Sequence, residues 1–316
     1  MALNRVTLSG ATGLIGRGLA RRLAQRGIAL TVLSRSPKRA RARLQDAAGA
    51  IEAVAWDPLR EPAPAAALQG SDAVVHLAGE RVDQRWSEKA KSAIRESRVT
   101  GTSNLIAGLA QAEPRPATLV CASAVGYYGA RGEEPLDEEA PAGAGFLGEI
   151  CASWEAQAER ARSLQMRVVR LRIGVVLAAE GGALARMLPP FRLGLGGPVG
   201  RGDQYLSWIA LDDLLALMIA ALEDERFNGA VNATAPEPVT SREFARELGH
   251  ALRRPARLPV PALALRALFG EMAQTITTGA RVMPARALML GFRFRHPELD
   301  EALRAILGAA GGGEAS

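Results

Sequence analysis

The chain has few of the residues that mark secreted, metal-binding or membrane proteins. Only two of its 316 residues are cysteines, and Cys121 and Cys151 have neither the spacing of a metal site nor the number needed for a disulfide framework. We therefore expect reduced thiols, a cytoplasmic location and no bound metal. No apolar run approaches the ~20 residues that cross a bilayer, and "MALNRVTLSGATG" is expected to begin a strand rather than a signal peptide. We expect no membrane association.

Aromatic residues are also scarce, at 4% of the chain, and this bears on its positive charge. Lys and Arg number 39 against 33 Asp and Glu, which gives a net charge of +6. Such a balance can indicate nucleic-acid binding. Here the basic residues are spread among acidic ones, and few aromatic side chains are available to stack on bases. We expect a solvated, arginine-rich surface and disfavour nucleic acid as a partner.

Short apolar runs with strand character alternate with helical patterns over the first half of the chain. The runs cover residues 5–9, 28–34, 51–56, 72–79, 117–123 and 166–177. Between the first two, Ile15, Leu19 and Leu23 recur at helical spacing. Apolar strands that alternate with helices are typical of a parallel sheet buried on both faces. The sequence therefore predicts a doubly wound α/β domain, a Rossmann fold, over residues 1–177.

The pattern changes after residue 178. Residues 189–204 are rich in Gly and Pro and predict a loop, and helical runs such as "LLALMIAAL" and "SREFARELGHAL" follow. We expect a smaller, mostly helical C-terminal lobe over residues 178–308, which would contribute to the substrate site. A disordered tail is expected over residues 309–316.

A glycine-rich turn, "SGATGLIG", joins the first strand to the first helix. Gly10 permits a tight turn, Gly13 lets the backbone approach a pyrophosphate, and Gly16 lets the helix pack closely on the sheet. The N–H groups at the start of the helix would bind the anion. The position of this motif between strand and helix predicts dinucleotide binding.

The end of the second strand, "VLSRS", bears on which dinucleotide binds. An NAD site usually has an acidic residue there, whereas this chain has Ser34 and Arg35. A guanidinium pairs with a 2′-phosphate, which a carboxylate would repel. Hydrogen bonds to charged groups contribute about 1.5–3 kcal/mol each. We predict NADP(H) rather than NAD(H), while Lys38 and Arg39 could reinforce the phosphate site or form a solvated helix start.

Several segments taken together resemble the extended short-chain dehydrogenase/reductase superfamily: "SGATGLIG", "VLSRS", "DAVVHLAGE", "VCASAVGYYG" and "LRIGVVL". The last third, with "GGPVGRGDQYLSWIALDDL" and "RVMPARALMLGFRF", is similar to the atypical, epimerase-like branch (NAD-dependent epimerase/dehydratase-like) that carries its own small C-terminal domain. The resemblance covers roughly residues 4 to 308. It implies a small-molecule substrate bound between a cofactor domain and that small domain.

The resemblance implies a set of residues that contact the cofactor. They are Gly10, Ala11, Thr12, Gly13, Leu14, Ile15, Gly16, Ser34, Arg35, Asp57, Leu77, Ala78, Gly79, Arg98 and Val176. Asp57 would lie near adenine and Val176 near nicotinamide. Arg98 stands where most extended members have asparagine, which implies a second contact on the phosphate side; the alternative is a charge on the helix surface.

The sequence departs from this superfamily at the tyrosine and lysine that usually form the catalytic pair. The superfamily places Tyr-x-x-x-Lys at the start of the helix that contains "SWEAQAE", and alignment on Glu155 puts Leu147 and Cys151 at those positions. The chain has no lysine after Lys91, so no other register restores the pair.

Three residues remain as catalytic candidates. They are Ser123, Tyr127 and Tyr128. Ser123 ends the fifth strand as the usual serine or threonine does, but its hydroxyl could equally bond the loop backbone, and both tyrosines could pack between the lobes.

Two functions therefore stay open. The first is an NADP(H)-dependent oxidoreductase or epimerase-like enzyme that acts on a small carbonyl or sugar-type substrate without the usual pair. The second is a non-catalytic NADP(H)-binding sensor or regulatory protein. The sequence leaves the oligomeric state open, with a homodimer as one candidate.

Overall fold

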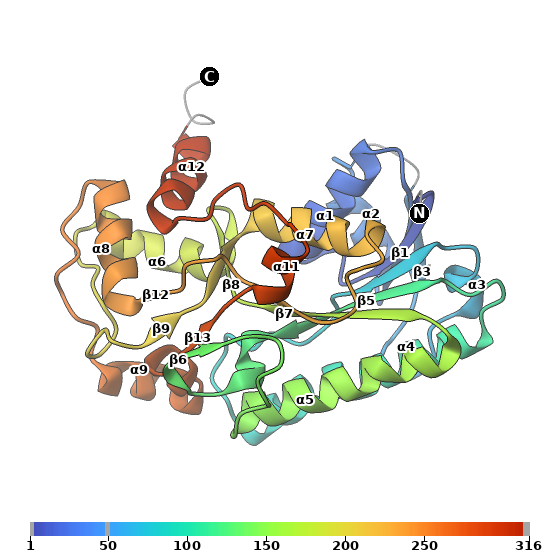
Figure 1. Ribbon diagram of the computed structural model, residues 1–316, viewed down its shortest axis with the longest axis horizontal. Coiled ribbons are helices and arrows are strands. Elements are labelled where there is room, and N and C mark those ends of the chain that lie inside the picture. The colour runs from blue at the N-terminus through green and yellow to red at the C-terminus, as the bar shows by residue number, and fades with distance from the viewer. Residues whose placement is uncertain (1–2, 48–50, 312–316) are drawn as a thin grey trace.

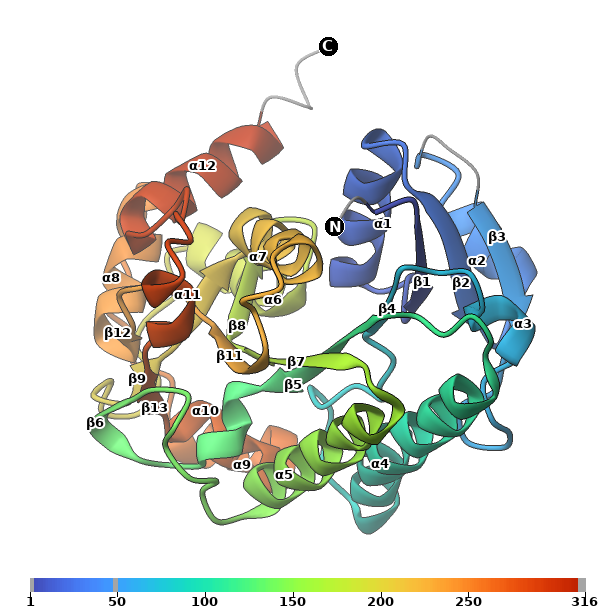
Figure 2. The same ribbon diagram turned by 45° about the vertical axis from the view of Figure 1, so that its right-hand side comes forward.

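A seven-stranded sheet with helices on both faces forms the larger part of the molecule (Figures 1 and 2). The computed structural model describes residues 3–47 and 51–311. The sheet strands pair in parallel in the order β11-β7-β5-β4-β1-β2-β3. They are β1 (Arg5–Ser9), β2 (Ala29–Ser34), β3 (Ile51–Ala55), β4 (Ala73–His76), β5 (Thr118–Ala124), β7 (Arg167–Ile173) and β11 (Gly229–Ala233). The expected doubly wound Rossmann fold is confirmed.

The strand order reverses next to β1. From β1 the chain continues to β2 and β3 on one side and then returns to place β4 on the other side of β1. In open α/β sheets, ligands bind outside the carboxyl ends of the strands at such a reversal. The turn after β1 and the segment after β4 both lie at this point, so the sheet order alone places a candidate cofactor site there.

Long helices cover the two faces of the sheet. The helices α4 (Glu88–Gln111) and α5 (Phe146–Glu159) pack side by side on one face, and α1 (Leu14–Gln25) and α7 (Leu211–Glu223) pack together on the other (Figure 2). The strands are apolar because both faces are covered: all four residues of β4 are buried. The short helices α2 (Pro37–Arg43) and α3 (Ala65–Leu68) flank β2 and β3.

A second core forms the C-terminal lobe around Trp208, Phe244 and Leu303. The helices around this core are α6 (Gly182–Arg192), α8 (Ser241–Leu252) and α12 (Leu299–Gly311). The helices α9 (Ala262–Phe269) and α10 (Ala273–Thr277) instead pack with Trp86, and α11 (Ala285–Met289) packs on the large sheet. Three pairs of short strands accompany them: β8 (Val175–Ala178) with β10 (Trp208–Ala210), β9 (Tyr205–Leu206) with β12 (Val239–Thr240), and β6 (Gly132–Leu136) with β13 (Ala280–Val282). The lobe is mostly helical, and the β6–β13 pair joins it to the first half of the chain.

The chain after residue 177 contributes to both cores. The helix α7 and the strand β11 come from the segment expected in the C-terminal lobe, yet both pack with the large sheet. The division into 1–177 and 178–308 therefore stays a prediction about folding units. The helix α12 extends to Gly311, so residues 309–311 are helical where we expected a disordered tail over 309–316; residues 312–316 lie outside the described residues.

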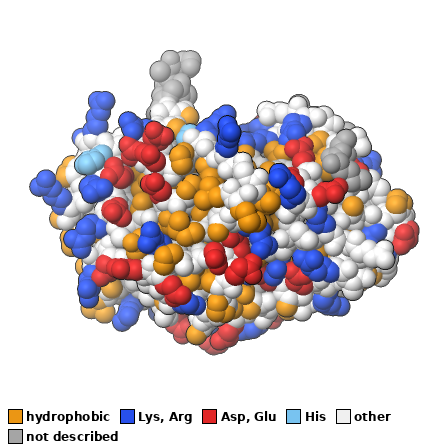
Figure 3. Space-filling view, viewed as in Figure 1, with side chains coloured by type: hydrophobic (Ala, Val, Ile, Leu, Met, Phe, Trp, Pro, Cys, Tyr) orange, Lys and Arg blue, Asp and Glu red, His pale blue; other side chains and the backbone are white. Residues whose placement is uncertain are grey.

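The surface mixes charges of both signs. On the face shown in Figure 3, basic and acidic side chains are interspersed. Within residues 3–47 and 51–311, no helix is both long enough and apolar enough to cross a membrane.

Candidate functional site

The turn after β1 packs against the segment after β4. Gly10 has φ +71°, and a Cβ there would lie 2.6 Å from the carbonyl carbon of Leu77. A Cβ on Gly16 would lie 2.3 Å from the Gly10 oxygen, so α1 also packs directly on the turn. Only glycine fits at these two positions. The structure thus brings the residues from Gly10 to Gly16, expected to contact the cofactor, next to Leu77, another expected contact residue.

The start of α1 presents a free anion-binding end. Gly13 is the N-cap residue, no side chain caps the helix, and its first turn has no acidic residue. Gly13 is exposed, and the nearest atom to a Cβ there is the Gly10 oxygen at 3.5 Å. The first N–H groups of a helix lack partners within it and bind anions. A pyrophosphate therefore fits at this end.

The end of β2 carries an arginine without a partner. The Ser34 hydroxyl accepts a hydrogen bond from the Ser36 N–H at 3.2 Å, which shapes the turn. The Arg35 side chain is exposed and has no hydrogen bond or ion pair to any residue that the structure describes. Sequence reasoning missed Arg43, whose Nη1 donates to the Thr12 carbonyl oxygen at 3.4 Å. The sequence signal for Arg43 was its position at the end of α2, a short helix rich in basic residues that follows Arg35.

The other expected contact residues line the same edge of the sheet. Asp57 follows β3; its carboxylate accepts from the Leu59 N–H at 3.1 Å and pairs with Arg60 at 3.4 Å. Ala78 is partly buried and Gly79 exposed in the segment after β4. Val176 lies in β8, beyond the end of β7, and is partly exposed.

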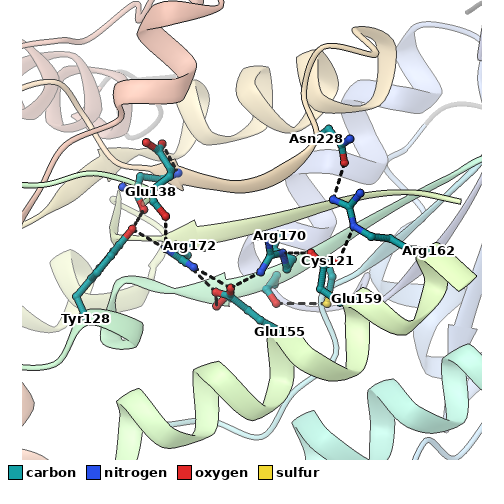
Figure 4. Close-up of polar contacts among 12 residues, drawn as sticks. Cys121, Tyr128, Glu138, Glu155, Glu159, Arg162, Arg170, Arg172 and Asn228 are labelled. Atoms are coloured by element: carbon teal, nitrogen blue, oxygen red, sulfur yellow. Dashed lines mark hydrogen bonds and ion pairs between the residues drawn. The ribbon is translucent and has the colours of Figure 1, made fainter. Parts of the chain in front are cut away.

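Ser123 lies in a buried ionic network. Its hydroxyl donates to Glu155 Oε1 at 2.7 Å and is 3% exposed. Glu155 also accepts from Arg172 Nε at 2.9 Å, Arg172 Nη2 at 3.0 Å and Arg170 Nη1 at 3.0 Å (Figure 4). These bonds to Glu155 outweigh the opposing effect of burial and raise the pKa of Arg172. The Ser123 proton is therefore directed to Glu155.

Tyr128, the second tyrosine among the catalytic candidates, belongs to the same network. Its hydroxyl donates to Asn232 Oδ1 at 2.6 Å and accepts from Arg172 Nη1 at 2.9 Å. The side chain is fully buried, and this burial raises its pKa to about 12. Both hydrogen-bonding functions of this phenol are therefore occupied by protein groups, and its catalytic role stays a prediction.

The network joins the large sheet to the C-terminal lobe. The Glu138 carboxylate accepts from the Asn232 N–H at 2.9 Å and the Arg286 N–H at 3.1 Å, and its carbonyl accepts from Arg172 Nη1 at 3.1 Å. Burial raises the pKa of Glu138. Sequence reasoning missed these residues. The signal was the presence of Arg170 and Arg172 inside a strand that is otherwise apolar after Arg167.

Tyr127 remains as a candidate for proton transfer. It lies in the short 3₁₀ helix Val125–Tyr128 and is partly exposed. The Arg172 guanidinium carbon lies 3.5 Å from the centre of its ring. Its hydroxyl has no hydrogen-bond partner among the described residues.

In the helix α5, Leu147 and Cys151 stand at the positions of the family's usual tyrosine and lysine, and neither side chain exchanges a proton near neutral pH. Leu147 packs on Gly126, where a Cβ would lie 3.1 Å from the leucine side chain, and joins an apolar cluster with Trp86 and Met272. Cys151 is 3% exposed, and burial raises the pKa of its thiol to about 11.

Arg98 lies on the β4 and β5 side of the site. It is partly buried, and its guanidinium lies beside Gly79 and over the Trp154 ring of α5. It therefore faces the interior between α4 and α5 rather than forming a charge on the helix surface.

Comparison with known families and proteins identifies the family to which the chain belongs. The model of the NAD dependent epimerase/dehydratase family matches residues 6–233, and the model of a domain of unknown function (DUF1731) matches residues 260–306. The epimerase family protein SDR39U1 homolog, chloroplastic, of Arabidopsis thaliana is 43% identical over 308 residues, which are 96% of this chain and 86% of that protein. The human epimerase family protein SDR39U1 is 37% identical over 308 residues, covering 96% of this chain and 99% of that one.

Two solved structures are similar over almost the whole chain. The crystal structure of human SDR39U1 (isoform 2) with NADPH has a TM-score of 0.86 at 36% identity and covers 96% of this chain and 99% of that one. A nucleoside-diphosphate sugar epimerase from Corynebacterium glutamicum has a TM-score of 0.77 at 33% identity, covering 98% of this chain and 59% of that one. The reversed strand order, the glycine turn and these matches agree: the chain belongs to the NAD dependent epimerase/dehydratase family, in the branch with its own small C-terminal domain.

Proposed function

We propose that this chain binds NADP(H) across the carboxyl ends of β1, β2 and β4 and transfers hydride between the nicotinamide and a small carbonyl or sugar-type substrate. The observation that carries the proposal is Arg35, an exposed guanidinium without a partner among the described residues, which follows β2, the strand paired with β1, while the turn after β1 leads into the uncapped N-terminus of α1. The NADPH in the human relative supports the same cofactor here. When bound, the cofactor supplies or accepts the hydride.

The residues of the chain would bind and orient the reactants. The N–H groups that follow Gly13 hold the pyrophosphate, and Arg35 holds the 2′-phosphate through charge-assisted hydrogen bonds. The apolar cluster of Trp86, Leu147 and Met272 keeps water from the nicotinamide end. Tyr127 or solvent exchanges the proton, because the phenol of the family's usual pair is missing.

The missing pair lowers the expected rate without preventing the reaction. General acid–base catalysis contributes typically ~10²–10⁴-fold, whereas positioning two reactants can be worth effective molarities of ~10⁵ M or more. A reductase that keeps its cofactor and substrate in place therefore stays active at a reduced rate.

The residues at the positions of the usual catalytic pair support a second function. Leu147 and Cys151 offer no exchangeable proton near neutral pH, and the Ser123 hydroxyl is directed to Glu155. A protein that binds NADP(H) and reports redox state or supports a partner needs none of these groups.

Binding and turnover measured together separate the two functions. NADPH fluorescence gives the affinity, and the absorbance of the reduced nicotinamide gives turnover against a panel of aldehydes, ketones and sugar nucleotides. We expect binding and slow oxidation of NADPH by at least one carbonyl, with further slowing in Tyr127→Phe. Tight binding without turnover across the panel would support the sensor, and the absence of binding would refute both.

A further inference from the structure

An ion pair connects the segment after β4 with the C-terminal lobe. Arg186, in the second turn of α6, donates from Nη1 to the carbonyl oxygen of Asp83 at 3.2 Å, and its Nη2 lies 2.8 Å from the Asp83 carboxylate. The two residues are 103 positions apart in the chain. The guanidinium therefore forms a tertiary bridge that binds both the main chain and the side chain of its partner.

The two ends of this bridge lie on opposite faces of the sheet. The helix α6 begins beside α1, because a Cβ on Gly181 would lie 3.3 Å and a Cβ on Gly182 would lie 3.4 Å from the Leu14 side chain. In the segment after β4, Trp86 instead packs with Ile94 of α4. Since α1 and α4 cover opposite faces (Figure 2), the ion pair crosses the carboxyl ends of the strands from one face to the other.

Neighbouring contacts extend the ion pair into a closed ring. The turn after β1 packs on Leu77, and Leu14 at the start of α1 contacts the start of α6. Along α6 the chain reaches Arg186, and the ion pair leads through Asp83 back to Leu77. The ring lies at the carboxyl ends of β1 and β4, where the reversal of strand order favours ligand binding.

The proposed cofactor would extend through this ring. Its 2′-phosphate would lie at Arg35, which follows β2, and its nicotinamide near Val176 in β8. The strand β1, whose turn forms part of the ring, lies between β2 and β4 in the sheet. A dinucleotide that reaches from Arg35 to Val176 would therefore pass beneath the ion pair, with its two halves on opposite sides of it.

The groups that close the ring can separate without disturbing the fold. The segment after β4 is anchored at one end, where the Glu80 N–H donates to Ser97 Oγ at 2.9 Å, and at the other, where Trp86 is buried. Between these anchors the Asp83 side chain is 41% exposed, and the Arg186 side chain is 50% exposed. Ion pairs between exposed side chains are weak, so rotation of the Arg186 side chain is enough to open the ring.

We propose that the ion pair of Arg186 with Asp83 is a clasp over bound NADP(H), which opens each time the nicotinamide half enters or leaves. The inference rests on the proposed cofactor site but requires no turnover. Because the clasp joins two protein groups and leaves the cofactor untouched, it slows association and dissociation by the same factor and leaves the affinity unchanged. It lengthens the time for which a bound cofactor stays in the site.

Two variants with opposite changes of charge test the clasp: Arg186→Gln and Asp83→Asn. Surface plasmon resonance on the immobilised protein gives the association and dissociation rates of NADPH. Each variant should raise both rates by about 2–5-fold, the factor that corresponds to an exposed ion pair, and change the dissociation constant by less than about 2-fold. Attraction between these side chains and the NADPH phosphates would instead make Arg186→Gln weaken binding and Asp83→Asn strengthen it.

The variant Arg81→Gln is the matched control. The Arg81 guanidinium donates to both oxygens of the same Asp83 carboxylate at 3.0 Å, but from within the segment, so its loss leaves the bridge in place. Both NADPH rates should change by less than about 2-fold in this variant. The matched ligand is 2′,5′-ADP, which lacks the nicotinamide nucleotide and does not pass beneath the clasp. Its rates should be the same in the wild type, Arg186→Gln and Asp83→Asn.

The outcomes separate the clasp from the cofactor site itself. Unchanged NADPH rates in both variants, or effects of Arg186→Gln and Asp83→Asn in opposite directions, overturn the clasp. So does an equal acceleration in Arg81→Gln, or an equal acceleration of 2′,5′-ADP. Failure of the wild type to bind NADPH overturns the proposed function, and the clasp with it.

Discussion

The substitution Glu155→Gln tests the buried network most sharply. The Glu155 carboxylate accepts four hydrogen bonds, from Ser123, Arg170 and twice from Arg172, and its side chain is 4% exposed. Glutamine keeps the shape but removes the charge and points an N–H₂ donor at other donors. Removing one partner of a buried pair costs about 3–5 kcal/mol, because the other charge stays buried. We expect a loss near the lower end, about 3 kcal/mol, because the Tyr128 hydroxyl still accepts from Arg172.

Urea unfolding measures this loss. The urea concentration at the midpoint of unfolding should fall, while the dependence of the free energy of unfolding on urea concentration should stay unchanged. Glu159→Gln is the matched control on the same helix: its side chain is 29% exposed, and its loss should stay below about 1 kcal/mol. The double variant Glu155→Gln/Arg172→Gln should lose less than the sum of the single variants, because both buried charges are gone. A loss below about 1 kcal/mol for Glu155→Gln would refute the reasoning.

Three further outcomes are expected. Gly10→Ala should lower the free energy of unfolding in urea by more than Gly27→Ala. Both glycines have a positive φ, which costs an L-residue about 1–2 kcal/mol, but only at Gly10 would the new Cβ also lie 2.6 Å from a backbone atom. Equal losses would contradict the close packing at Gly10. Burial lowers the pKa of His76 from 6.5 to about 4, so the unfolded state binds a proton first, and stability attributable to His76 should fall by about 2 kcal/mol between about pH 8 and pH 5; an unchanged pH dependence in His76→Gln would contradict this. Tyr128→Phe should lower the free energy of unfolding by about 1–3 kcal/mol through two lost hydrogen bonds, leaving the pH profile of NADPH binding unchanged; an altered profile would support a functional role for Tyr128.

Local patterns in the sequence were sufficient to predict much of the fold and the glycine turn at the carboxyl end of β1. The six expected strands are present because buried parallel strands are continuous apolar runs. Gly10 in the turn and Gly16 in α1 lie where backbone atoms approach too closely for a side chain, so the glycine motif and the geometry coincide. The roles of Arg35 and the neighbouring residues in cofactor binding stay predictions that the geometry supports.

Contacts between distant segments could not be predicted in the same way. The strand β11 was expected in the C-terminal lobe, and its place beside β7 depends on pairing across a long intervening segment. Adjacent tyrosines look equivalent in the sequence, whereas the 3₁₀ turn buries Tyr128 and leaves Tyr127 partly exposed. The partners of Glu155 come from β5 and β7, so its role was visible only after folding.

The central claim is that an arginine at the end of β2 and the open start of α1 together bind a phosphorylated dinucleotide. Calorimetric titration of NADPH and NADH into the wild type and Arg35→Asp tests it directly. We expect NADPH to bind the wild type at least about 10-fold more tightly than NADH, and Arg35→Asp to weaken NADPH much more than NADH. Absence of heat with both NADP⁺ and NADPH in the wild type, or equal losses for NADPH and NADH in Arg35→Asp, would contradict the claim.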